Sequence, residues 1–192
     1  IENNLNLQNF FPEVENKLFL KNNQLQITYK KNSLEILGSG NLLLQKKLDQ
    51  IKYQLIKKKD DLNFDVKLNI KDNDLKFDLF NFKKKNKSDL KIEVQGKHNT
   101  KKGILFKKIN LVENNNSILI KKLSLSNDNK INYIKYITLN YQDQDNLRNN
   151  IQIKKKNKNY HINGTSLNIN RLINNLINSK SKKKYNLFND DF

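Results

Sequence analysis

The side chains that could bind a metal or transfer protons are few and widely spaced along the chain. The two histidines, His98 and His161, are far apart and do not form an HxH or HxxxH pair, and the chain has no cysteine. Because a zinc site needs several nitrogen or thiolate ligands that converge on one point, this spacing predicts no metal site. Without cysteine, disulfide bonds are also excluded.

The carboxylates lie where turns are expected. Asp60-Asp61 and Asp72–Asp74 fall in short polar clusters between apolar stretches, where their local hydrogen bonding to the backbone explains them. The sequence contains no GxSxG, P-loop, HExxH or GxGxxG pattern. We therefore expect no catalytic residue, no cofactor and no small-molecule substrate, and we predict that the protein is not an enzyme.

Lysine is the most abundant charged residue. The chain carries 37 basic and 19 acidic residues, for a net charge of +18, and only Arg148 and Arg171 are arginine. Two explanations remain open. One is an AT-rich coding sequence, which favours Lys, Asn and Ile, and the other is an attraction to anionic surfaces. Arginine is the usual reader of bases, so its scarcity argues against a specific nucleic-acid partner.

The elements that carry these residues alternate with a period of two. Leu62, Phe64, Val66, Leu68 and Ile70 alternate with polar residues, which places the apolar side chains on one face of a β-strand. The same pattern recurs along the chain. The candidate apolar lining is Leu62, Phe64, Val66, Leu68, Ile70, Leu75, Phe77, Leu79, Leu90, Ile92, Val94, Ile118, Ile120, Ile137, Leu139, Tyr141, Ile151 and Ile153.

Polar clusters separate these strands at a nearly regular step of about 13 to 16 residues, with centres near 60, 73, 86, 100, 115, 128, 144 and 157. Strands at this pitch without intervening helices predict an antiparallel meander. Residues 42–56 also fit a helical spacing, but nearby glycines and Tyr53 favour two strands. At Leu79-Phe80-Asn81-Phe82 the apolar residues change face, which predicts a β-bulge.

One helix is expected near the end. Ile169, Leu172, Ile173, Leu176 and Ile177 form one apolar stripe, which predicts a short amphipathic helix over 168–178, capped by a polar residue at 166 or 168. The expected organisation is a repetitive β domain over 1–178, as a segment of a longer protein, followed by a basic, disordered tail over 179–192.

A sheet of many strands that are apolar on one face only can fold in two ways. The sheet can close on itself as a sandwich or barrel with a dry core. Alternatively, it can curl into a β-taco, an open groove whose apolar floor accommodates lipid chains. Each buried methylene stabilises a bound chain by about 0.8 kcal/mol, so such a groove requires no specific polar contacts.

The end of the chain is similar to a known family. The stretch Asn159-Tyr160-His161-Ile162-Asn163-Gly164-Thr165-Ser166-Leu167-Asn168-Ile169-Asn170-Arg171-Leu172-Ile173-Asn174-Asn175-Leu176 resembles a recurrent element of the AsmA-like superfamily, which includes the YhdP and TamB types. In that element a strand ends in glycine and a small polar residue and leads into a short helix. Asn168 stands where an aspartate is frequent. The strand repeats over 34–40 and 118–125 look similar to those of the same family.

The resemblance implies the C-terminal segment of an alphaproteobacterial envelope protein. Such a protein is tethered to the inner membrane by a segment outside this chain and extends through the periplasm. Its function is bridge-like transfer of phospholipid between the inner and outer membranes in outer-membrane biogenesis. The implied partners are phospholipid acyl chains and the membranes at either end. The alternative is a structural or adhesive β-repeat protein with a dry, closed core and no ligand.

Overall fold

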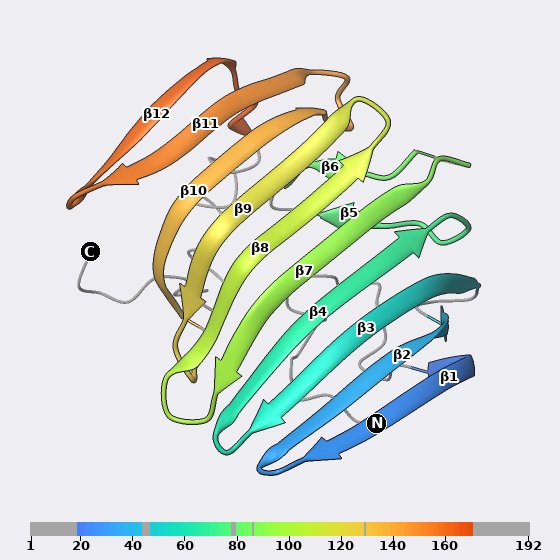
Figure 1. Ribbon diagram of the computed structural model, residues 1–192. Helices are drawn as coiled ribbons and strands as arrows, with labels where there is room; N and C mark the ends of the chain where they lie inside the picture. The colour runs from blue at the N-terminus through green and yellow to red at the C-terminus, as the bar shows by residue number, and fades with distance from the viewer. Residues whose placement is uncertain (1–18, 44–46, 78–79, 86, 129, 171–192) are drawn as a thin grey trace, which may run out of the picture.

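The computed structural model describes residues 19–43, 47–77, 80–85, 87–128 and 130–170, and all of its long elements are β-strands (Figure 1). The strands are β1 (Phe19–Lys30), β2 (Ser33–Leu43), β3 (Leu48–Lys58), β4 (Asp61–Ile70), β5 (Lys76–Phe77), β6 (Phe82–Lys83), β7 (Leu90–Asn99), β8 (Gly103–Glu113), β9 (Asn116–Leu125), β10 (Ile131–Gln142), β11 (Arg148–Lys156) and β12 (Asn159–Ser166). The predicted all-β class is confirmed.

Ten of these strands form one antiparallel sheet in the order β1-β2-β3-β4-β7-β8-β9-β10-β11-β12. Apart from the step from β4 to β7, every neighbour in space is the neighbour in sequence, so the predicted meander is confirmed. β1 and β12 lie at opposite edges of a twisted, curved sheet and do not pair with each other (Figure 1). The sheet is therefore not closed into a barrel.

The register keeps the apolar residues on one face. Residues directly opposite one another in antiparallel strands share a face. One such row crosses eight strands through Tyr53, Val66, Val94, Ile109, Ile120, Ile137, Ile153 and Ile162. The alternation in the sequence is therefore translated into a single apolar face, which runs across the sheet from β3 to β12.

Irregularities in the pairing of β7, β8 and β9 keep the apolar residues of these strands on one face. Lys107 is left out of the pairing between β7 and β8, so that Phe106 and Ile109 both remain on the apolar face. In β9, Lys122 has a φ of 53°, and Leu123 and Ile120 likewise share that face. Each irregularity places an extra lysine away from the apolar side chains.

The stretch after β4 differs from the prediction. Leu75 and Phe77 do not belong to another strand of the main sheet, and Leu79 lies outside the described residues. Instead of a bulge, β5 and β6 form a separate two-stranded sheet in which Phe77 pairs with Phe82. β4 pairs directly with β7, so this hairpin is an insertion between two neighbouring strands.

Two further predictions have different outcomes. Residues 42–56 form the end of β2 and most of β3, as expected, rather than a helix. The helix predicted over 168–178 falls mainly on residues 171–178, and the tail over 179–192 falls entirely outside the described residues. At the expected helix start, Asn168 Oδ1 accepts a hydrogen bond from the Asn170 backbone N–H at 3.2 Å.

Candidate functional site: an apolar sheet face covered at one end

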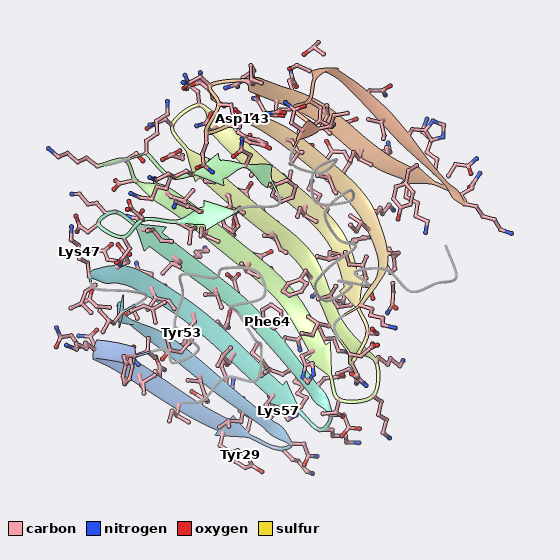
Figure 2. All side chains as sticks on the ribbon, turned by 180° about the vertical axis from the view of Figure 1, so that it is seen from behind. Tyr29, Lys47, Tyr53, Lys57, Phe64 and Asp143 are labelled. Carbon is pink, nitrogen blue, oxygen red and sulfur yellow. The ribbon has the colours of Figure 1, made fainter. Side chains whose placement is uncertain are left out.

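The candidate site is the apolar face of the ten-stranded sheet, and its two ends differ. The open end carries the turns β1–β2, β3–β4, β7–β8, β9–β10 and β11–β12, and the covered end carries the opposite turns and the β5–β6 hairpin. Figure 2 looks onto this face, where the hairpin lies in front of the sheet and the Tyr53 and Phe64 side chains project from β3 and β4.

Beneath the hairpin, the apolar face is a dry core. Leu75 and Phe82 from the insertion pack with side chains from β4 through β11, and each core member is at most 6% exposed. The Phe82 ring makes an edge contact with Tyr141, with centroids 5.9 Å apart, and a tilted contact with Phe77 at the same distance. The sheet residues of this core are Ile70, Leu90, Leu111, Ile118, Leu139, Tyr141 and Ile151.

A buried polar contact fixes the start of the insertion. The Asn73 amide donates hydrogen bonds to Asp49 Oδ2 and to the Lys47 carbonyl, each at 2.6 Å. Asp49 Oδ1 also accepts from the Lys71 backbone N–H at 2.8 Å. Asp49 and Asn73 are 2% and 4% exposed, so these bonds are shielded from water and hold the chain where it leaves β4.

The end of the insertion is held in a similar way. The Lys84 side chain is 2% exposed, and its ammonium donates to the Lys71 carbonyl at 2.8 Å and to the Lys85 carbonyl at 3.3 Å. Glu113, at the end of β8, is 1% exposed and accepts a hydrogen bond from the Lys85 backbone N–H at 2.6 Å. Ser88 Oγ donates to the same carboxylate.

The middle of the insertion bonds to the end of β10 and to the β10–β11 turn. Tyr141 Oη donates to the Phe80 carbonyl at 2.5 Å, and Asn81 Nδ2 donates to Asp145 at 2.7 Å. Burial, aided by the nearby Asp143 charge, raises the pKa of the Tyr141 hydroxyl, which therefore stays a donor. With contacts at its start, middle and end, the hairpin is a fixed part of the sheet face.

Away from the hairpin, aromatic rings lie on glycines of the neighbouring strand. A Cβ added to Gly96 would come within 2.5 Å of Phe64 Cζ, and one added to Gly38 would come within 2.2 Å of Tyr53 Cζ. Phe64 also makes an edge contact with Phe106 at 5.9 Å. All three rings are only partly buried, in contrast to Phe82.

The open end is lined with basic turns. Lys31, Lys59, Lys101, Lys102 and Lys158 lie in its turns and are all exposed. On the apolar face itself, Lys57 lies opposite Leu62, which in turn lies opposite His98. A polar surface depression of about 610 Å³ at this end, lined by residues from 30 to 61, lies beside these turns and carries both lysines and carboxylates.

Comparison with protein-family profiles, curated proteins and solved structures returns no match. Function therefore has to be inferred from this geometry.

The predicted lining residues divide into two sets. Phe64, Val66, Val94 and Ile120 share the apolar face and are partly exposed, together with Leu62, Leu68, Ile92, Ile137 and Ile153. The other sheet residues, Ile70, Leu90, Ile118, Leu139, Tyr141 and Ile151, are sealed in the core. These six, and Leu75 on the insertion, are buried by the chain's own side chains, whereas Phe77 packs against the same core and is only partly buried.

Several residues of the apolar face, some exposed and some in the core, were not among the predicted ones. Phe106, Ile109 and Leu111 of β8 face the same side, but the extra residue Lys107 breaks their alternation. Tyr53 and Leu55 of β3 join the face through their pairing with β4. A search for two alternating half-strands separated by one extra residue would have found the β8 set.

Within the described residues, no group of three or more His, Asp or Glu side chains could hold a metal ion. The same part of the chain contains no helix that is long and apolar enough to span a membrane. What the arrangement offers chemically is apolar contact area on one side of a sheet, with basic groups at one end.

Proposed function

We propose that this chain is a lipid-carrying segment of a bridge-like transfer protein of the bacterial envelope, as its resemblance to the AsmA-like superfamily implies. Acyl chains would lie on the part of the apolar face outside the β5–β6 hairpin, near Phe64, Val94 and Phe106, which the described residues leave partly exposed. The observation that carries the proposal is the single apolar face of an unclosed, ten-stranded sheet.

Burial of the acyl chains supplies the free energy of binding. A lipid with about 30 methylenes faces a cost on the order of 20 kcal/mol when its tails enter water. A continuous row of partly exposed apolar side chains, such as Val66, Val94 and Ile109, offsets much of this cost. Dispersion and the hydrophobic effect are not directional, so no polar contact to the tail is required.

The two ends suggest how a lipid would be oriented. The β5–β6 hairpin seals the covered end with Phe82, whereas the open end presents exposed lysines such as Lys59 and Lys101. Phosphate head groups are attracted to lysine ammonium groups. Tails would therefore point toward the hairpin, and head groups would stay in solvent beside the basic turns.

A second candidate function is a structural β-repeat scaffold without a ligand. The observation that favours it is the dry core beneath the hairpin, where Ile70 and Leu90 are fully buried by the chain's own side chains. In this case the partly exposed residues near Phe64 would simply be the margin of that core.

Native mass spectrometry of the purified protein, with and without the substitution Phe64→Asp, separates the two functions. The lipid proposal predicts bound phospholipid on the unmodified protein and its loss from a variant that remains folded, because Phe64 is only partly buried. A matched control, Asp65→Asn, changes the opposite face of the same strand and should retain the lipid.

Protein that is purified free of lipid and takes up none from added phospholipid would reject the proposal in favour of the scaffold. The same conclusion follows if Phe64→Asp unfolds the protein, as judged by circular dichroism, because Phe64 would then be a core residue.

A further inference from the structure

The outer face of the sheet, opposite the apolar face, is divided into two electrostatically different halves. On β2 to β7 the outer-face carboxylates have partners. Asp61 Oδ2 lies 2.8 Å from Lys97 Nζ. The Gln54 amide donates to Glu35 at 2.7 Å, and the Gln95 amide donates to Asp65 at 2.8 Å. Glu93 of β7 is the last outer-face carboxylate before β8, and its Oε2 lies 2.6 Å from Lys108 Nζ of β8.

Beyond that ion pair, the outer face of β8 to β12, all of whose residues the structure describes, carries no carboxylate. The only acidic residue within these five strands is Glu113, which is buried on the apolar face beside the hairpin. Asp128, Asp143 and Asp145 lie in turns, where Ser126, Asn168 and Asn81 bond to them. We name five exposed lysines of β8, β9 and β11 the basic patch: Lys107, Lys121, Lys122, Lys154 and Lys156.

The register concentrates this charge. Lys108 lies directly opposite Lys121, Lys121 opposite Tyr136, and Tyr136 opposite Lys154. Like charges placed directly opposite each other destabilise a sheet. None of the basic patch forms an ion pair within the described residues, so an anionic partner would supply the counter-charge that these strands lack.

A lysine-rich coding bias does not account for this division. Such a bias acts on every strand alike, and β3 and β4 also carry exposed lysines, Lys52 and Lys67, directly opposite each other. It would not remove every carboxylate from the outer face of β8 to β12 while retaining four carboxylates on the outer face of β2 to β7.

We propose that the basic patch binds the surface of an anionic lipid bilayer. The patch is two-dimensional, spanning four strands about 4.8 Å apart, and thus suits a plane of charge rather than one phosphate. Its central ring, Tyr136, is not free to stack on a base, because Lys121 Nζ lies 5.7 Å from the ring centroid and Gln152 donates to the hydroxyl at 2.8 Å. Base stacking is what single-stranded nucleic-acid binders use.

The test is co-sedimentation of the full chain with vesicles of phosphatidylcholine alone or mixed equally with phosphatidylserine. We expect binding to the mixed vesicles only, decreasing as salt is raised. Lys121→Gln combined with Lys154→Gln should weaken the vesicle affinity about thirty-fold. The matched control, Lys52→Gln with Lys67→Gln, removes the same charge from the other half and should weaken it much less.

Equal weakening by the two double variants would overturn the proposal, because net charge alone would then explain binding. Failure to bind the mixed vesicles would overturn it as well. So would a single-stranded oligonucleotide that binds more tightly than the vesicles at equal phosphate concentration and depends on Lys121 and Lys154. None of these outcomes depends on a tail bound to the apolar face, so the proposed lipid-transfer function is tested separately.

Discussion

At the residue scale, glycines set where large rings lie on the apolar face. Gly38 and Gly96 each face an aromatic ring of the adjacent strand, and the missing Cβ leaves the space that the Tyr53 and Phe64 rings occupy. Glycine normally weakens a strand, so its presence in the middle of β2 and β7 is explained by this contact. Sequence alternation alone could not predict the pairing, because it depends on the register between strands.

The substitution Gly38→Ala is expected to destabilise the protein by about 1–3 kcal/mol, because the new methyl group would overlap the Tyr53 ring at 2.2 Å. In a Tyr53→Ala background, the same change should be neutral or stabilising, since alanine is then the better strand residue. Urea denaturation of the four proteins measures this difference. Equal costs in both backgrounds would show that the ring does not lie on Gly38.

Asp143 makes stability depend on pH. Burial of its carboxylate raises the pKa, but hydrogen bonds from Asn168, Asn149 and the backbone more than offset this, so the pKa lies below the ordinary value of 3.8. A lowered pKa in the folded state means that the contribution to stability is present above pH 3.8 and is lost as the pH falls through the folded-state value.

Asp143→Asn should therefore lower the Tm at neutral pH, and this difference should shrink as the pH falls from about 4 towards 2. Thermal unfolding followed by circular dichroism across this range measures it. A constant difference between the two proteins at all pH values would contradict the assigned role of the charged carboxylate.

At the element scale, the long strands could be predicted from sequence and the insertion could not. The strict alternation from Leu62 to Ile70 is translated directly into β4. Leu75 and Phe77 continue the same spacing, but neither belongs to a strand of the ten-stranded sheet. Buried polar contacts, such as those of Asn73 and Lys84, fix that outcome, and they connect residues distant in sequence.

The position of the insertion predicts that truncation of Phe82 destabilises the protein more than truncation of Phe64. Phe82→Ala should cost about 3–5 kcal/mol, because the ring is 1% exposed and packs on Tyr141 and Phe77. Phe64→Ala, on the part of the face outside the hairpin, should cost about 1–2 kcal/mol, because this ring is only partly buried. Urea denaturation of both variants provides the comparison. A larger cost at Phe64 than at Phe82 would mean that the dry core lies elsewhere.

At the scale of the whole molecule, the two faces and two ends are chemically distinct. The apolar face is sealed at the covered end by Phe82 and is bordered by exposed lysines such as Lys59 at the open end. Sequence alternation identified much of this face, including Phe64 and Val94, but not which part the hairpin covers. The covered part depends on the fold. β4 pairs directly with β7, and the period-two pattern of the inserted residues looks the same as that of a further hairpin of the main sheet.

Lipid transfer by this chain requires that acyl tails lie on the part of the apolar face that the β5–β6 hairpin does not cover. Photo-crosslinking tests this contact directly. A photoreactive amino acid is placed in turn at Phe64, Asp65, Val66 and Lys67, whose side chains alternate between the two faces of β4. We expect phospholipid adducts at Phe64 and Val66 and none at Asp65 or Lys67. Adducts of equal yield at all four positions, or none at Phe64 and Val66, would contradict the proposed function.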